Sequence, residues 1–352
     1  MTGPILVLNA GSSSLKAELF GEGLASLLAL SVSEIGGAGE LVVGEARRPV
    51  SAPGHEAALA LLLEALEAAG HPPESLRAAG HRVVHGGGLT APARVTEEVL
   101  EIIRAACPLA PLHNPANLAG IEALARLAPA LPQTASFDTA FHATQPPLAT
   151  TYALPQALRD RGLRRYGFHG LSYASLVARL DPLPRRLLAL HLGNGASLCA
   201  IEEGRSVATS MGYSPASGLV MGTRAGDIDA ALVLRLAAEE GIAGAEEILL
   251  RQSGLTGLAG TNDMQTLLAR PDAEARFAVD AFCYWAIRHG ASAVAAMGGL
   301  DAIVFTGGIG EHAAPVREAI AAGLAFLGPA EVRVMEADEE RQIARDALAL
   351  LA

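Results

Sequence analysis

The sequence predicts an α/β protein with two domains, and three observations support this prediction. The chain has 352 residues, which is enough for two hydrophobic cores. Short apolar runs bounded by glycine alternate with longer Ala/Leu-rich segments of helical period, as expected where helices cover a sheet. A strand–turn–strand pattern occurs twice, in Pro4–Phe20 and in Arg186–Glu203, and this repetition indicates a duplicated unit.

The remaining elements follow from periodicity and capping residues. Helices are predicted over five segments, the second with Thr96 as its N-cap: Glu56–Ala69, Thr96–Ala106, Asp229–Glu240, Asp280–Met297 and Glu339–Leu351. A strand at Ala302–Thr306 precedes a third glycine turn, GGIGEH. The Pro-rich stretch at 143–155 marks the expected domain crossover. We therefore expect one domain of residues 1–142 plus 341–352 and another of residues 143–340.

Composition excludes several classes of protein. The formal net charge is −11 and no run of Lys and Arg is present, so we expect no nucleic-acid partner. The N-terminus has no basic segment before a long apolar one, and other apolar stretches are short, so neither a secretory signal nor a membrane partner is expected. The three cysteines are widely spaced, which predicts buried reduced thiols and a cytoplasmic location.

The first hairpin turn, NAGSSSLK, has the groups that bind phosphate. It offers consecutive backbone N–H groups, the hydroxyls of Ser12 and Ser14, the amide of Asn9 and the ammonium of Lys16, the only lysine in the chain. Alone, such a turn is more simply an ordinary polar hairpin. Two such turns and a third glycine turn in one α/β chain favour a nucleotide site, although neither a P-loop nor a GxGxxG fingerprint is present.

Six further motifs make the resemblance to a known family specific. They are GHRVVHGG at 80–87, APLHNPAN at 110–117, SFDTAFHATQP at 136–146, RRYGFHG at 164–170, SMGYSPASGLVMGTRAGDID at 210–229 and FTGGIGEH at 305–312. In this order, with the two hairpins, they resemble the acetate kinase family within the superfamily of acetate and sugar kinases, heat-shock proteins and actin. The resemblance implies a duplicated ribonuclease-H-like (actin-like ATPase) fold with the active site in a cleft between two domains.

The resemblance also implies an activity and its residues. The implied reaction is Mg²⁺-dependent, reversible phosphoryl transfer from ATP to acetate, giving acetyl phosphate and ADP, with Mn²⁺ as an alternative ion and a homodimer as the usual assembly. Arg82, Asp138, His169 and Arg224 match the catalytic residues; Arg82 also belongs to the substrate site. Val84, Leu112, Phe168 and Pro215 match the apolar pocket for the substrate methyl group, and Asn9 and Glu339 match the magnesium site.

The residues implied for the nucleotide come from the hairpin turns and two later segments. They are Ser12, Ser14, Lys16, His191, Leu192, Gly193, Asn194, Gly195, Asp263, Met264, Gln265, Gly308, Ile309, Gly310, Glu311 and His312. The sequence departs from the family pattern at Gln265, where Arg is usual, and at His312, where Asn is usual.

Other functions fit parts of the sequence. HGGG at 85–88 and GLSYA at 170–174 approximate the oxyanion loop and nucleophile elbow of a serine hydrolase, but the residues before Ser172 do not form a buried strand. A non-catalytic actin-like module would need the phosphate turns alone. A metal site at His81 and His85 lacks the glutamate of HExxH and is rejected. Propionate as the substrate remains open, because one methylene changes discrimination by only about 1–3 kcal/mol.

Overall fold

The computed structural model describes residues 3–352, which form two compact units. The first unit extends to Phe141 and also includes Gly170–Ser175 and Asp338–Ala352. The second consists of His142–His169 and Leu176–Ala337. Residues 1 and 2, which the expected N-terminal domain includes, lie outside the described residues. The inclusion of Gly170–Ser175 in the first unit has no counterpart in the expected boundaries.

The first unit contains an eight-stranded sheet in the order β5-β4-β3-β2-β1-β6-β8-β7. Its strands are β1 (Ile5–Ala10), β2 (Leu15–Phe20), β3 (Ser26–Val32), β4 (Ala38–Val43), β5 (Ala46–Ser51), β6 (Ala78–Val83), β7 (Ala93–Arg94) and β8 (Gln133–Phe137). Strands β1, β2 and β3 are antiparallel, whereas β1, β6 and β8 are parallel to one another.

The second unit contains a five-stranded sheet in the order β11-β10-β9-β12-β13. Its strands are β9 (Arg186–Leu192), β10 (Ala196–Glu202), β11 (Arg205–Thr209), β12 (Ala302–Thr306) and β13 (Glu331–Val334). Strands β9, β10 and β11 are antiparallel, and β9, β12 and β13 are parallel.

The two sheets share one plan. The order β3-β2-β1-β6-β8 in the first unit matches β11-β10-β9-β12-β13 in the second, with the same sequence of antiparallel and parallel pairs. Both predicted hairpins are present, since β1 joins β2 and β9 joins β10 through short turns. The predicted duplicated α/β fold is therefore confirmed.

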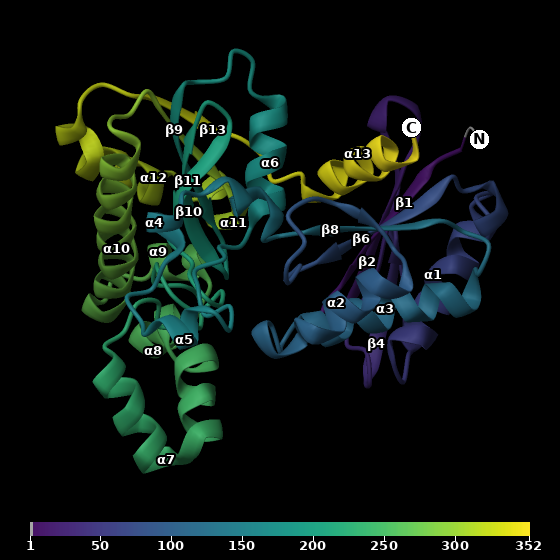
Figure 1. The fold of residues 1–352 in the computed structure, drawn as a ribbon. Helices are drawn as coiled ribbons and strands as arrows, with labels where there is room; N and C mark the ends of the chain where they lie inside the picture. Colours follow the sequence, from purple (N-terminus) through teal and green to yellow (C-terminus); the bar gives the residue numbers. More distant parts are fainter. Residues whose placement is uncertain (1–2) are drawn as a thin grey trace. The chain divides into compact units, whose positions relative to one another are not determined.

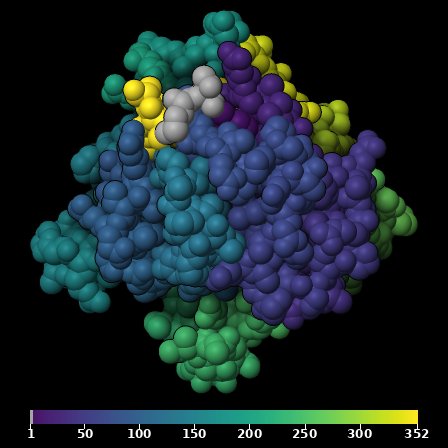
Figure 2. Space-filling model, turned by 90° about the vertical axis from the view of Figure 1, so that its right-hand side faces the viewer, coloured from purple at the N-terminus to yellow at the C-terminus, as the bar shows by residue number. Residues whose placement is uncertain are grey.

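Alternation along β1 explains how helices cover both faces of the first sheet. Leu6 and Leu8 point to one face, where they pack with α1 (His55–Ala68) and α3 (Asn114–Leu127). Ile5 and Val7 point to the other face, where they pack with Ile343 of α13 (Glu339–Leu351). Figure 1 shows α13 and the pair α1 and α3 on opposite sides of this sheet. In Figure 2 the purple and blue residues of this unit form one continuous surface.

Two long helices differ from their predicted bounds. Helix α7 (Ala230–Arg251) begins after its Asp229 cap as expected but continues well beyond residue 240. Gly241 interrupts it with φ 75° and ψ 167°, so α7 is two helical segments joined at a glycine that can adopt this conformation. Helix α10 (Ala273–Met297) begins seven residues before the predicted start, at a cap supplied by Asp272. The apolar period alone did not reveal either extension.

The other helices are shorter or closer to expectation. Thr96 caps α2 (Glu97–Ala105) as predicted, by accepting a hydrogen bond from the backbone N of Val99. The remaining α-helices are α4 (Pro147–Thr150), α5 (Gln156–Arg159), α6 (Gly170–Arg179), α8 (Gly254–Ala259), α9 (Met264–Ala269), α11 (Gly307–His312) and α12 (Ala314–Leu324). The predicted third glycine turn is wrong in form, because GGIGEH is the helix α11.

Two of the three cysteines lie in the interior of the protein. Cys199 and Cys283 are buried free thiols, as predicted, but Cys107 is only partly buried. Within residues 3–352 no helix combines the length and apolar character needed to cross a membrane.

His81 is a buried titratable group inside β6. It is 3 % exposed, and one ring nitrogen, Nε2, lies 2.7 Å from the Gln133 side-chain oxygen on β8. Burial lowers the pKa of His81 to about 4, although the bond to Gln133 opposes this shift. Among the described residues no group of three or more His, Cys, Asp or Glu could hold a metal ion.

We predict that His81 makes the protein sensitive to acid. Because the folded pKa of about 4 lies below the ordinary 6.5, only the unfolded state takes up this proton between these values. The stability contributed by neutral His81 is therefore complete above pH 6.5 and falls by about 3 kcal/mol as the pH reaches 4.

Denaturant unfolding of wild type and His81→Gln across this range measures the loss of stability. The wild type should lose more stability than the variant, while His312→Gln, at an exposed histidine, should follow the wild type. Equal slopes for wild type and His81→Gln would contradict the prediction.

Candidate functional site

Parallel strands bring three polar side chains of the first unit to one edge of its sheet. Because β1, β6 and β8 are parallel, their carboxyl ends meet there. Asn9 is near the end of β1, Arg82 is near the end of β6, and Asp138 directly follows β8. The sequence motifs named these residues, but only the strand order explains why they lie close together.

Arg82 is fixed by two carboxylates. Its Nε and Nη2 donate to the two oxygens of Asp138 at 3.1 and 2.8 Å, and its Nη1 lies 3.4 Å from an oxygen of Glu339. Asp138 is 1 % exposed, so the pair is largely shielded from water. Burial lowers the pKa of the Arg82 guanidinium, but Asp138 and Glu339 outweigh this effect and raise it overall. Arg82 is thus held as a charged, oriented planar donor.

Glu339 is a buried carboxylate at the start of α13. Burial raises its pKa to about 7; the charge of Arg82 opposes the rise, and the charge of Asp138 adds to it. Lys16 also acts on this carboxylate and stabilises its charged form. Lys16 lies opposite Asn9 in the β1–β2 pair, so Asn9, Lys16 and Glu339 belong to one region of the first unit.

This donor set suits a magnesium ion. Asn9, Asp138 and Glu339 offer oxygen atoms, which are the ligands that Mg²⁺ prefers, and Mg²⁺ commonly keeps several waters and substrate oxygens beside few protein ligands. A cation would also offset the cost of burying the charged form of Glu339. The residues present therefore fit the ion.

The first hairpin turn is compact and partly open to solvent. The backbone N of Gly11 donates to the carbonyl of Ser14 at 2.8 Å and closes the turn. Ser12 and Lys16 are exposed and Ser14 is partly exposed, so their polar groups are accessible to a ligand.

Two asparagines outside the predicted site hold its backbone. The Asn114 side chain accepts from the His85 N–H and donates to the His85 carbonyl, both at 2.9 Å. Asn117 accepts from the backbone N of Val84 and donates to the carbonyl of Ala10. The motif APLHNPAN thus fixes the segment after Arg82 and the end of β1, a role that its sequence did not indicate.

In the second unit Arg224 is a partly buried cation whose hydrogen-bond partners in the described chain are uncharged. Its Nη1 donates to the carbonyl of Pro215 at 3.0 Å and lies 3.9 Å from the sulfur of Met221. Within the described part of the chain, no carboxylate lies within ion-pair distance of it, in contrast to Arg82. Burial lowers the pKa of Arg224. A guanidinium in this setting would be stabilised by a bound anion.

The side chains of His169 and Arg224 both approach Gly195. Its Nδ1 lies 2.8 Å from Ser197 Oγ, and its ring stacks on His191 with centroids 4.2 Å apart. A Cβ built on Gly195 would lie 3.4 Å from His169 Nε2 and 3.6 Å from Arg224 Nη1. Two nitrogen groups therefore converge over the glycine turn between β9 and β10.

The glycine segments of the second unit also approach one another. A Cβ on Gly193 would lie 4.0 Å from the backbone N of Gly308, which brings the β9–β10 turn next to α11. Asn194 accepts from the Asn262 side chain at 3.0 Å, and its carbonyl accepts from the backbone N of Gly222. The segments predicted to bind nucleotide are thus neighbours within this unit.

Thr306 is a further candidate residue of the nucleotide site, and its sequence did not indicate this role. It ends β12, pairs with His191 in the parallel register, and is completely buried. Its hydroxyl has no hydrogen-bond partner among residues 3–352. A threonine before GGIGEH is too ordinary in sequence to be singled out, so only the structure identifies it.

Several predicted nucleotide residues have structural roles. Asp263 caps α9 by accepting from the backbone N–H groups of Gln265 and Thr266, and the bond from the Thr266 side chain lowers its pKa. Glu311 accepts from the backbone N–H groups of Gly307 and Ala337. Others are distinguished by exposure: Leu192, Met264 and Gly310 are buried, Ile309 is partly buried, and Gly308, Gln265 and His312 are exposed.

The predicted apolar residues are divided between the units. Val84 and Leu112 belong to the first unit, and Phe168 and Pro215 to the second. Val84 and Phe168 are buried, whereas Leu112 and Pro215 are partly exposed.

The serine hydrolase alternative fails on local structure. Ser172 lies inside α6, and the residues before that helix form no strand within the described chain. A nucleophile elbow requires a strand that leads directly into the serine turn.

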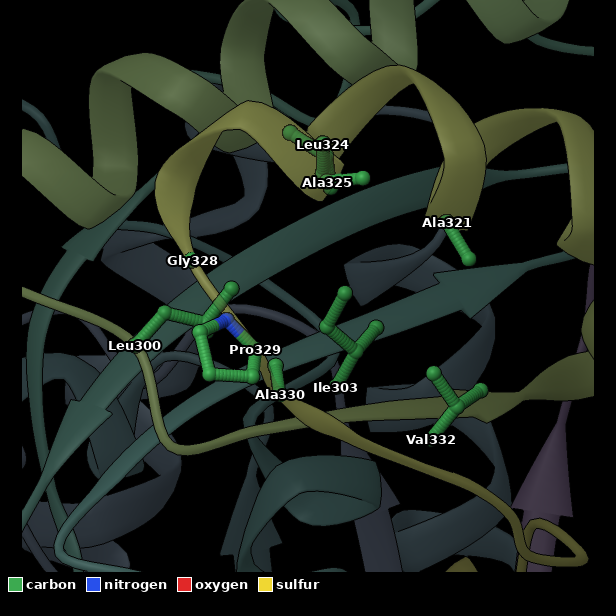
Figure 3. Close-up of a pocket in the computed structure, with 9 residues that line it drawn as sticks. All are labelled: Leu300, Ile303, Ala321, Leu324, Ala325, Gly328, Pro329, Ala330 and Val332. Carbon is green, nitrogen blue, oxygen red and sulfur yellow. The ribbon is translucent and has the colours of Figure 1, made fainter.

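An apolar groove of the second unit is not a phosphate site. Figure 3 shows its lining residues, which come from β12, β13, the end of α12 and the segments beside them. All are apolar or glycine, and none is a predicted site residue: Leu300, Ile303, Ala321, Leu324, Ala325, Gly328, Pro329, Ala330 and Val332.

Comparisons with known proteins agree with these observations. The family model described as "Acetokinase family" matches residues 4–347. An acetate kinase of Rhodopseudomonas palustris is 45 % identical over 351 residues, covering 93 % of this chain and 88 % of the relative. The crystal structure of a Porphyromonas gingivalis acetate kinase has a TM-score of 0.91 at 33 % identity and covers 100 % of both chains. A Francisella tularensis propionate kinase has a TM-score of 0.93 at 35 % identity, covering 98 % of this chain and 99 % of that one.

Proposed function

The chain belongs to the acetokinase family, and from that premise we propose that it transfers the γ-phosphoryl group of ATP reversibly to acetate. The products are acetyl phosphate and ADP. The acetate kinase of Rhodopseudomonas palustris and that of Porphyromonas gingivalis support acetate as the acceptor.

One observation carries the proposal beyond family membership. Arg224 is a partly buried guanidinium without a carboxylate partner in the described chain, and its Nη1 converges with His169 Nε2 over Gly195. Phosphoryl transfer needs positioned donors around the charge that develops on the equatorial oxygens, and little covalent chemistry. A phosphoryl group is the anion that this arrangement suits.

In the proposed mechanism an acetate oxygen attacks the γ-phosphorus in line while the bond to the ADP oxygen breaks. Arg224 and His169 stabilise the equatorial oxygens through charge and hydrogen bonds. Arg82, oriented by its two bonds to Asp138, binds the acetate carboxylate.

We assign Asn9 and Glu339 to a magnesium ion, with Mn²⁺ as an alternative. When bound, the ion neutralises phosphate charge and orients the phosphate oxygens. The oxygen donors and the raised pKa of Glu339 support this assignment. The nucleotide is assigned to the hairpin turns and to the segments at 263–265 and 308–312. Except for Ser12, Ser14 and Lys16, which belong to the first unit, these residues are in the second unit.

The size of the carboxylate is the finer part of the proposal. Val84, Leu112, Phe168 and Pro215 are assigned to the substrate methyl group, and acetate is favoured because the curated relatives are acetate kinases. Propionate is the second candidate, because the Francisella tularensis structure is that of a propionate kinase.

We also propose a homodimer. Helix α7 carries three exposed apolar side chains, Leu232, Leu234 and Ile242, of which Ile242 is 81 % exposed. Exposed apolar residues grouped on one element are typical of an association surface. The cytoplasmic location and the lack of nucleic-acid and membrane partners stay predictions of the sequence.

The proposed activity is tested by trapping acyl phosphates as hydroxamates. Purified protein with ATP, Mg²⁺ and acetate should form acetohydroxamate after addition of hydroxylamine, and EDTA should abolish the product because the phosphate charge is no longer neutralised. Parallel reactions with propionate and butyrate rank the acceptors by kcat/KM. A preference for propionate would correct the substrate, and no acyl phosphate from any of the three would refute the function.

Arg224→Ala should lower kcat by about 10²–10³-fold, the loss expected when one transition-state donor is removed. The thermal unfolding midpoint should not fall, because the variant removes a partly buried charge that no carboxylate of the described chain compensates. Arg235→Ala is the matched control, since this arginine is exposed on α7 and pairs with Glu239. It should retain wild-type turnover. Wild-type turnover in Arg224→Ala would remove this residue from the mechanism.

A further inference from the structure

The backbone around His169 is held in an uncommon conformation. His169 has φ 58°, in the left-handed region that non-glycine residues rarely adopt, and Gly167 has φ 80°. Between them, the Phe168 carbonyl lies 2.9 Å from His142 Nε2. A carbonyl only accepts, so His142 Nε2 carries a proton and donates it. Such a conformation persists only where its surroundings fix it, and it occurs often at functional sites.

The ring of His169 is held as firmly as its backbone. Ser197, at the second position of β10, is completely buried, and its Oγ lies 2.8 Å from His169 Nδ1. On one face the ring stacks on His191, with an angle of 29° between the ring planes. Rotation of the imidazole is therefore restricted, and its other nitrogen, Nε2, lies beside the space above Gly195 that Arg224 also approaches.

The hydroxyl of Ser197 allows two arrangements of protons on a neutral imidazole. If Oγ–H donates to Nδ1, then Nε2 carries the ring proton and is a donor. If Nδ1–H donates to Oγ, then Nε2 presents a lone pair to the space beside Arg224. An anionic phosphoryl oxygen would be attracted in the first arrangement and repelled in the second.

We propose that Ser197 is a positioning residue that holds His169 as the Nε2–H tautomer, with this N–H directed to the space above Gly195. The inference rests on the proposed function, because it assigns the phosphoryl group to that space. Ser197 acts through His169, in the way that a second group often fixes the tautomer of a functional histidine.

Ser197→Ala tests the role in catalysis. The variant should lower kcat by about 10–100-fold, as is usual for loss of an orienting partner, with KM for acetate and ATP close to wild type. Ser197→Thr, which keeps the hydroxyl, should recover most of kcat. Ser210→Ala is the matched control, because the Ser210 hydroxyl is also buried and accepts from the backbone N of Leu198, on the same strand as Ser197. It should keep wild-type kcat.

The tautomer itself is measured by ¹⁵N NMR of histidine-labelled protein, with the His169 signals assigned by comparison with His169→Gln. In wild type, Nε2 should be protonated and Nδ1 should not; Ser197→Ala should show a mixture of tautomers. Wild-type kcat in Ser197→Ala, or a wild-type ring protonated at Nδ1 alone, would overturn the proposal. If wild-type protein makes no acyl phosphate, the proposed function fails, whereas the NMR spectrum still decides the role of Ser197.

Discussion

Parallel pairing beside an antiparallel hairpin is the constraint on which both units depend. In each unit the first strand turns back through a glycine-rich hairpin and also pairs in parallel with a later strand. The turn and the carboxyl ends of the parallel strands must then lie at the same edge of the sheet. This geometry collects Asn9, Arg82 and Asp138 in one unit, and it places His191 beside Thr306 in the other. Residues distant in sequence meet because the directions of the paired strands bring them to the same edge of the sheet.

The two arginines proposed for the site, Arg82 and Arg224, differ in how their charge is balanced. Asp138 and Glu339 already neutralise Arg82, so its donors are oriented before any ligand binds. Arg224 contacts a carbonyl and a thioether, which are uncharged, so a bound anion would compensate its charge. The first arrangement favours recognition of a planar carboxylate, and the second favours a group whose negative charge grows during reaction.

Much of the fold could be predicted from the sequence because local patterns of apolar and turn residues determine where these strands and helices begin and end. Both hairpins, β12 and α13 agree with the prediction at nearly every residue, since apolar runs and glycine turns mark their ends. The break at Gly241 was missed because a glycine within a helical pattern does not by itself reveal its φ. The third glycine segment was predicted as a turn because GGIGEH contains three glycines, although it forms a short helix.

Identification of the candidate site from sequence depended on motifs, and the contacts of individual residues within those motifs were missed. Ser197 lies in GNGAS, where a serine is as common in an ordinary turn as in a functional one. Asn114 and Asn117 were inside a motif, but their side chains bind the backbone of another segment, a contact that depends on the folded chain. Strand order and long-range pairing decide such contacts, and neither is visible in local periodicity.

The position of α13 has a consequence for how the protein forms in the cell. Its residues Ile343, Ala344 and Ala347 complete the apolar layer that covers Ile5, Val7 and Ala78. During translation that face of the first sheet stays uncovered until α13 has been synthesised, and α13 follows all residues of the second unit. The first unit therefore cannot complete its core before α13 is synthesised. A nascent chain interrupted before α13 exposes an apolar surface that chaperones would recognise.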